Sequence, residues 1–162
     1  MIEYASFYKS SGIDYICDPG QSLTAWEGKT LKEWITGSLL LISNDYELEL
    51  IMKMTGMDKK GLLAMARTII TTLGEKGSVI STSKGDISIP AARISGIVDP
   101  TGAGDAYRSG LLKGIVMGKD IVTAAKVGAV AAAYAIEKYG TQEHCYTYED
   151  FVKRYSDNFG KL

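Results

Sequence analysis

A glycine-rich turn in the second half of the chain ends in a carboxylate. The turn is Gly102-Ala103-Gly104, the carboxylate is Asp105, and residues with helical character follow at once. Glycine lets a ligand approach the backbone closely, and the first turn of a helix offers unpaired N–H groups beside the positive end of the helix dipole. This arrangement suits an anion. A carboxylate beside it predicts a base that deprotonates a hydroxyl attacking a phosphoryl group, although an ordinary Asp N-cap would give the same pattern.

Three further motifs accompany this turn. Asn44-Asp45-Tyr46-Glu47 follows an apolar run, Thr72-Leu73-Gly74-Glu75-Lys76-Gly77 follows a β-branched run, and the last motif spans 137–144. In this order, and together with residues 99–110, they resemble the ribokinase/PfkB family of sugar and nucleoside kinases. Residues 137–144 are similar to the ending seen in its adenosine kinase-like branch. The resemblance covers essentially the whole chain.

The resemblance implies a reaction and roles for the turn. The reaction is ATP-dependent transfer of the γ-phosphoryl group to a hydroxymethyl group of a sugar or nucleoside, with adenosine as the first acceptor to test. Asp105 is then the general base. The N–H groups near Gly102, Ala103 and Gly104 stabilise the charge on the transferring phosphoryl oxygens.

The Asn-x-x-Glu motif is implied to act on the phosphates and on a metal ion. Asn44 and Glu47 are three residues apart where a strand passes into a helix, so both side chains can face one site. The resemblance places Asn44 near the phosphates and Glu47 on Mg²⁺ through water. The plain alternative for Glu47 is a first-turn carboxylate that the helix dipole favours.

A second set of residues is implied to contact the nucleotide. Thr72, Gly74 and Gly77 belong to the family's nucleotide loop, and Ala132 lies on a helix of small residues near the adenine. The alternatives are a glycine-rich turn leading into a hairpin, and simple close packing of helices. Lys76 is not assigned to phosphate, because no Gly-Lys-Ser/Thr sequence follows to make a P-loop.

The resemblance also implies a monovalent cation such as K⁺ beside the anion site. Asp99 is its candidate carboxylate, and Thr101, Gly140 and Gln142 are further candidates for the same site. The single histidine, His144, is expected to be a surface or capping group rather than a catalyst.

Strand and helix patterns alternate along the chain. We expect helices at 1–11, 28–37, 45–54, 59–67, 103–117, 120–139 and 147–156, and strands at 13–18, 38–43 and 68–72. Residues 77–82 and 86–89 predict a hairpin. The fold class is therefore α/β, with a ribokinase-like, doubly wound and mostly parallel sheet. In such sheets ligands lie beyond the carboxyl ends of the strands, where Asn44, Thr72 and Asp99 are predicted.

The family's N-terminal half has no counterpart in this sequence. That half carries a Gly-Gly substrate motif and a lid over the acceptor site, so we expect residues 1–162 to be the C-terminal, nucleotide-binding and catalytic half of the domain. A half-domain that binds nucleotide without catalysis remains the second possibility. The apolar strand at 13–18, left without neighbours, predicts a homo-oligomer.

Composition limits the other partners. The chain has 162 residues, of which 46% are apolar and 23% charged, and its formal net charge is −1. This charge gives no reason to expect nucleic acid or an anionic membrane as a partner. The widely spaced Cys17 and Cys145 suggest idle thiols in a reducing cytoplasm.

Overall fold

The computed structural model describes residues 2–162, which form two compact units. The first contains the chain up to Leu73 together with Val79–Ser88, and the second contains Gly74–Ser78 together with Ile89–Leu162. No helix among residues 2–162 combines the length and the apolar character needed to cross a membrane.

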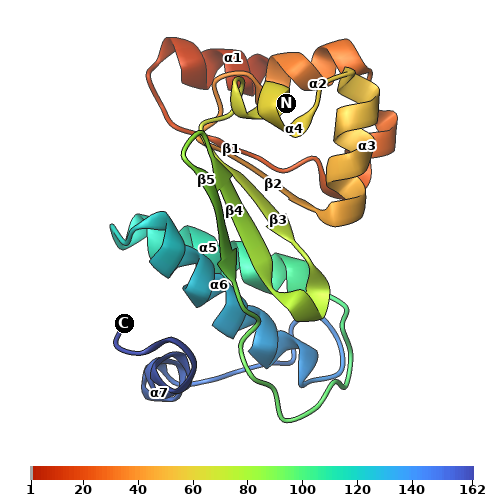
Figure 1. The fold of residues 1–162 in the computed structure, drawn as a ribbon. Coiled ribbons are helices and arrows are strands. Elements are labelled where there is room, and N and C mark those ends of the chain that lie inside the picture. Colours follow the sequence, from red (N-terminus) through yellow and green to blue (C-terminus); the bar gives the residue numbers. More distant parts are fainter. Residues whose placement is uncertain (1) are drawn as a thin grey trace. The chain divides into compact units, whose positions relative to one another are not determined.

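The first unit is an α/β unit (Figure 1). Its helices, strands and one 3-10 helix follow in the order α1 (Ile2–Ser10), β1 (Ile16–Cys17), η1 (Gly20–Ala25), α2 (Gly28–Ile35), β2 (Leu40–Asn44), α3 (Asp45–Thr55), α4 (Lys59–Leu63) and β3 (Ile69–Thr72). The hairpin strands β4 (Ser78–Thr82) and β5 (Gly85–Ile89) complete the sheet, each crossing the boundary between units by one residue.

The sheet has the strand order β1-β2-β3-β4-β5. β1 and β3 both run parallel to β2, and the register pairs Leu41 with Ile69 and Asn44 with Thr72. Buried Leu41 and Ile69 share a core with Leu31 and Ile35 of α2 and Ile51 of α3. Because the strands are parallel, the last residues of β2 and β3 lie side by side at the carboxyl edge of the sheet.

Helix ends in the first unit follow from capping. The Asn44 side chain accepts a hydrogen bond from the Glu47 amide, and the Glu47 carboxylate accepts one from the Asn44 amide, which together make a capping box at the start of α3. Gly56, with φ of 65°, ends the helix in the left-handed conformation that glycine adopts without strain.

Two predicted elements of the first unit are shorter than expected. The strand predicted at 13–18 is reduced to Ile16–Cys17, because its partner β2 begins only at Leu40, which pairs with Ile16. The helix predicted at 59–67 ends at Leu63. Arg67 instead donates its amide to the Ser38 carbonyl, at the chain segment that leads into β2.

The second unit is mainly helical. It contains the short 3-10 helix η2 (Gly74–Lys76), α5 (Ala103–Val116), α6 (Ile121–Ile136) and α7 (Tyr148–Phe159). α6 ends before the predicted boundary at 139, because the amides of Val98 and Asp99 donate to the Ile136 carbonyl. Asp120 caps α6 and Thr147 caps α7, both through side-chain oxygens.

α5 and α6 pack closely at glycines. A Cβ on Gly110 would lie 2.8 Å from both the Gly128 Cα and the Val127 carbonyl oxygen, and a Cβ on Gly114 would lie 2.7 Å from the Ala124 Cα. These neighbours are backbone atoms that cannot rotate away. Close packing against α5 therefore explains the small residues of α6, as the alternative to a nucleotide-binding role had suggested.

We predict that Gly110→Ala destabilises the chain. In an open helix this change would stabilise by about 1 kcal/mol, but here the methyl group overlaps the backbone of α6 and the expected loss is about 1–3 kcal/mol. Urea unfolding measures the difference. Gly96→Ala is the matched control, since no atom lies within 4 Å of its new Cβ. Equal stability of the two variants would contradict the close-packing account.

Candidate functional site

The start of α5 has amides that no side chain caps. Gly102 is its N-cap residue, with φ of 82° and no capping side chain. The Ala103 amide donates to the Pro100 carbonyl at 3.2 Å, and regular helical bonding starts with Ala106, which donates to Gly102 at 2.9 Å. The amides of Gly104 and Asp105 therefore lie in the orphan first turn, where a helix attracts an anion.

Asp105 lies in this first turn and projects into solvent. Its side chain is 84% exposed, and the Arg108 Nη1 lies 3.3 Å from its Oδ1. Arg108 is only 25% exposed and folds back along the helix, so that a Cβ on Gly104 would lie 2.9 Å from the same Nη1. The carboxylate is thus open to a small molecule while a cation stays beside it.

The Asp99 carboxylate joins two loops beside this turn. Its Oδ1 accepts from the Thr101 amide at 2.9 Å and its Oδ2 from the Gly140 amide at 3.0 Å. Hydrogen bonds from the Thr101 hydroxyl and amide, and then from Gly140, lower the pKa of Asp99. The loops also pack, since a Cβ on Gly102 would lie 3.1 Å from that of Thr141. The structure therefore brings Asp99, Thr101 and Gly140 together, and their role at a cation stays a prediction.

An ion pair holds the segment that leads to Asp99. The Arg154 guanidinium of α7 donates to both oxygens of Glu137 at 2.6 and 2.8 Å and to the Arg93 carbonyl at 2.7 Å. Ser95 donates its amide and hydroxyl to the same carboxylate. These hydrogen bonds, Arg154 first, lower the pKa of Glu137 to about 2. The segment 93–99, which has no helix or strand, is fixed in this way.

In the first unit, Asn44 and Glu47 meet at the sheet edge. Their capping-box hydrogen bonds measure 2.7 and 2.8 Å. Thr72 lies beside Asn44 at the end of β3, as the register shows. Glu47 therefore does stabilise the start of α3, which is the plain alternative to metal binding. The capping box uses only its Oε2, so Oε1 remains for another ligand.

The two glycines of the predicted nucleotide loop differ in what fixes them. Gly74 has φ of 59° and open space around its Cβ position, whereas a Cβ on Gly77 would overlap the backbone from Ile89 to Ala91. Gly77 also has a positive φ, of 87°, so the backbone angle favours glycine at both positions and packing requires it at Gly77 in addition. Lys76 is the last residue of η2.

The remaining predicted residues are dispersed. Ala132 is half-buried on α6, and Asp99 does not follow the hairpin directly but lies well beyond β5 in an irregular segment. Gln142 and His144 line a hollow beside α5. Among residues 2–162, no three His, Cys, Asp or Glu side chains gather as a metal site would require.

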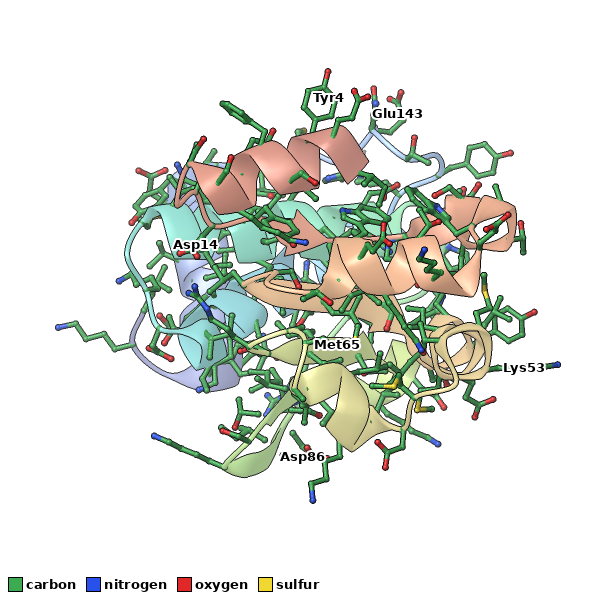
Figure 2. The ribbon with its side chains drawn as sticks, turned by 90° about the horizontal axis from the view of Figure 1, so that it is seen from above. Tyr4, Asp14, Lys53, Met65, Asp86 and Glu143 are labelled. Atoms are coloured by element: carbon green, nitrogen blue, oxygen red, sulfur yellow. The ribbon has the colours of Figure 1, made fainter. Side chains whose placement is uncertain are left out.

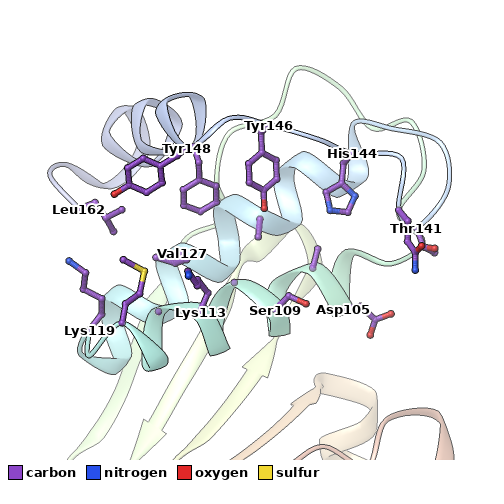
Figure 3. A pocket seen from close by; sticks show the side chains of 17 residues that line it. Asp105, Ser109, Lys113, Lys119, Val127, Thr141, His144, Tyr146, Tyr148 and Leu162 are labelled. Atoms are coloured by element: carbon purple, nitrogen blue, oxygen red, sulfur yellow. The ribbon is translucent and has the colours of Figure 1, made fainter.

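This hollow is a groove of about 670 Å³ in the second unit, and it was not predicted from the sequence. In Figure 3 the side chains of Tyr146, Tyr148 and His144 face α5, where Lys113 and Ser109 lie. The available signal was the density of aromatic residues at 144–151. Only the fold shows that they face a neighbouring helix.

A comparison with known families matches residues 3–147 to the model described as the pfkB family carbohydrate kinase. The nucleoside kinase of Methanocaldococcus jannaschii is 35% identical over 137 residues, which cover 85% of this chain and 45% of the relative. That of Methanothermobacter thermautotrophicus is 30% identical, with 95% and 50% covered. The chain thus spans about half the length of these curated relatives.

Solved structures agree with this match. The Burkholderia thailandensis nucleoside kinase in complex with inosine is 34% identical and superimposes with a TM-score of 0.94, covering 99% of this chain and 53% of that protein. The Arabidopsis thaliana ribokinase with ribose and ATP is 21% identical, with a TM-score of 0.80. The latter shows the shared ribokinase-like fold, a mostly parallel five-stranded sheet flanked by helices.

We predict that acid removes the contribution of Glu137 to stability. Its pKa is about 2 when folded, against an ordinary 4.5. A carboxylate whose pKa is lowered by folding stabilises the fold at pH values above its ordinary pKa. This stabilisation is lost as the pH falls from about 4.5 towards 2. Urea unfolding of the wild type and Glu137→Gln across this range measures the difference between them, which should be largest near neutral pH and shrink in acid. A difference that is independent of pH would contradict the ion-pair account.

Proposed function

Because the chain belongs to the pfkB family of carbohydrate kinases, we propose that it forms the nucleotide-binding and phosphoryl-transfer part of a nucleoside kinase. The observation that carries this proposal is the uncapped start of α5 with an exposed Asp105 in its first turn. Side chains cap α3, α4, α6 and α7, whereas α2 and α5 start without a side-chain cap. α5 differs from α2 in carrying an acidic residue, Asp105, in its first turn. An anionic ligand is the alternative partner for such amides.

Gly104 supports the same conclusion. It is helical, so its backbone angle does not require glycine, and only the mobile end of Arg108 would meet an added Cβ. Glycine inside a helix costs about 1 kcal/mol relative to alanine. A phosphoryl group approaching the backbone explains why a side chain is absent here.

The proposed chemistry follows from these positions. Asp105 accepts the proton of the acceptor hydroxyl as that oxygen attacks the γ-phosphorus of ATP, the bond from this phosphorus to the β,γ-bridging oxygen breaks, and ADP leaves. The amides of Gly104 and Asp105 stabilise the charge that spreads over the phosphoryl oxygens, because they are fixed before the reaction begins, while the Ala103 amide already donates to the Pro100 carbonyl. Arg108 lies 3.3 Å from the base and limits its movement.

Nucleotide and cations are assigned to the remaining residues. We propose that Asn44, Thr72, Gly74, Gly77 and Ala132 contact ATP. Glu47, with one oxygen left by the capping box, binds Mg²⁺ through water, which fits an ion that retains several waters beside phosphate. Asp99, Thr101, Gly140 and Gln142 are proposed to hold K⁺. The hydrogen bonds of Asp99 with the amides of Thr101 and Gly140 bring three of these four residues together, and Gln142 is not part of them.

The proposed acceptor is a purine nucleoside, with adenosine as the first choice. Two relatives that are at least 30% identical are nucleoside kinases, and the Burkholderia structure contains inosine. The second candidate function is a half-domain that binds nucleotide without turnover. It is favoured by one observation, that the matched relatives are about twice as long as this chain.

Phosphoryl transfer tests both candidates. The chain is assayed alone and in a chimera, the replaced form, in which it takes the place of the matched 53% of the Burkholderia nucleoside kinase. The superposition that defines the exchanged part covers 99% of this chain. Transfer from ATP to adenosine and inosine, with ribose as the competing acceptor class, is expected in the replaced form. Activity of the chain alone would exclude the half-domain. A folded, ADP-binding replacement that phosphorylates only ribose, or nothing, would contradict the proposal.

Asp105→Asn should lower turnover in the replaced form by about 10²–10⁴-fold, the usual contribution of a general base, with nucleotide binding nearly unchanged. Asp157→Asn, which changes an exposed aspartate on α7, is the matched control. Near-normal turnover of Asp105→Asn would remove the assignment of the base.

We further propose that the isolated chain forms a homodimer through the surface of α1. Tyr4 and Phe7 are 65% and 58% exposed, and Figure 2 shows Tyr4 directed outward from its helix. β1, next along the chain, is an edge strand of two residues, too short to hold a partner by itself. Exposed aromatic side chains next to a free edge favour a contact with a second copy.

Sedimentation velocity measures this association. The wild type should be a dimer at high concentration, and Phe7→Glu should shift it towards monomer. Tyr46→Lys, a change at an aromatic residue that is 72% exposed on α3, should leave the dimer intact. A monomeric wild type, or a dimer that persists in Phe7→Glu, would contradict an α1 interface.

A further inference from the structure

A groove in the second unit has the features of a small-molecule site. One end of it reaches Asp105 and Gln142, and the end near Lys113 and Lys119 has no role in the chemistry described above. It has a volume of about 670 Å³, within the range of about 300–1,000 Å³ that ligand pockets occupy. α5 forms one wall, and the segment before α7 together with its first turn forms the other (Figure 3). Its lining includes the cations Lys113 and Lys119 and the rings of His144, Tyr146, Tyr148 and Phe151.

The rings are held in place by one another. Tyr146 stacks on Tyr134 with a centroid distance of 4.3 Å, and lies 5.4 Å from Phe151 and 6.3 Å from His144. Tyr148, at the start of α7, is 67% exposed and leaves its ring free at the rim. Fixed aromatic faces beside an open ring favour a flat, aromatic ligand, because little side-chain freedom is lost on stacking.

A polar atom in the same wall lacks a partner. The His144 Nδ1 is shielded from solvent and makes no hydrogen bond within the described part of the chain. A buried polar nitrogen without a partner is unfavourable, so a ligand that offers a hydrogen-bonding group would stabilise it.

The charges of the groove are separated along α5. Lys113 and Lys119 have no acidic partner within ion-pair distance in residues 2–162. The carboxylate of the groove is Asp105, already beside Arg108. With a rise of 1.5 Å per residue, Lys113 lies about 12 Å along the helix from Asp105. An anionic group is therefore favoured at the lysine end, away from the base.

We propose that this groove binds a planar aromatic molecule that carries one anionic group. Its ring lies against Tyr146 and Tyr148, and its anionic group lies at Lys113 and Lys119. This ligand position is distinct from the amides at the start of α5, although the groove reaches Asp105 and Ala106 at its other end. It goes beyond the proposed kinase function and does not depend on it.

Adenosine monophosphate is the probe, because it joins a flat ring to a phosphate. Isothermal titration calorimetry is carried out on the whole chain in the wild type and in the Gly104→Val background, where the added side chain blocks the start of α5. Adenosine and inorganic phosphate, each half of the probe, should bind more weakly than the monophosphate. Raised salt should weaken the binding of the monophosphate more than that of adenosine.

Three further changes are made in the Gly104→Val background. Lys113→Glu should weaken binding at least about tenfold, because it replaces a favourable charge by a repulsive one. Tyr148→Ser, at an exposed ring, should weaken binding with the fold unchanged. Lys84→Glu, in the exposed turn of the β4–β5 hairpin, is the matched charge reversal and should have no effect. Circular dichroism and thermal unfolding verify that each variant is folded.

Several results would overturn the proposal. The absence of binding in the wild type would exclude the site, as would equal affinity in Lys113→Glu and Lys84→Glu. Binding that disappears in folded Gly104→Val would place the probe at the start of α5 instead. If sedimentation shows that Lys113→Glu abolishes self-association of the chain, the groove is a contact between copies and not a ligand site. Binding that survives Gly104→Val and is lost in both Lys113→Glu and Tyr148→Ser would support it.

Discussion

The close contact between α5 and α6 fixes the end of the helix on which the proposed chemistry depends. At Gly110 and Gly114 the two backbones approach so closely that a methyl group would overlap main-chain atoms of α6. A helix packed in this way has little freedom to slide or rotate. The direction of the amides at Gly104 and Asp105 is thereby set before any ligand arrives, which is the condition for electrostatic stabilisation of a transition state.

Polar contacts around the start of α5 add to this constraint. Asp99 joins the turn to Gly140, and the Glu137–Arg154 pair holds the irregular segment that precedes Asp99. Both carboxylates have lowered pKa values because they accept several hydrogen bonds in their folded positions. Asp105 differs from them in being exposed, with one cation beside it. The carboxylates that hold the structure are occupied, while the one proposed to react is accessible.

Much of the fold could be predicted from local sequence. Hydrophobic spacing and capping residues located α2, α3, α5 and the hairpin within a few residues, since these signals act over one or two turns. The family resemblance was confirmed by the match over residues 3–147. Boundaries were wrong where distant segments compete for the backbone, as at Arg67 with Ser38 and at Val98 with Ile136.

The candidate site was predictable only in part. The turn and its carboxylate are contiguous in sequence, so their chemistry could be inferred directly. The joining of Asp99 to Gly140, and of Glu137 to Arg154, depends on contacts between residues far apart in the chain. The aromatic groove was missed for the same reason, because nothing in residues 144–151 indicates which helix they face. Whether Asn44 and Glu47 contact nucleotide as well as cap α3 stays a prediction.

The start of α5 is proposed as the anion site for nucleotide phosphates. Titration of the ¹⁵N-labelled chain with Mg²⁺ and ADP, with each backbone amide followed by NMR, tests this proposal. The amides of Gly104 and Asp105 are expected to shift most within the second unit, with saturation at one common affinity. Saturable binding that shifts other amides of the second unit and leaves these two unchanged would contradict an anion site at the start of α5.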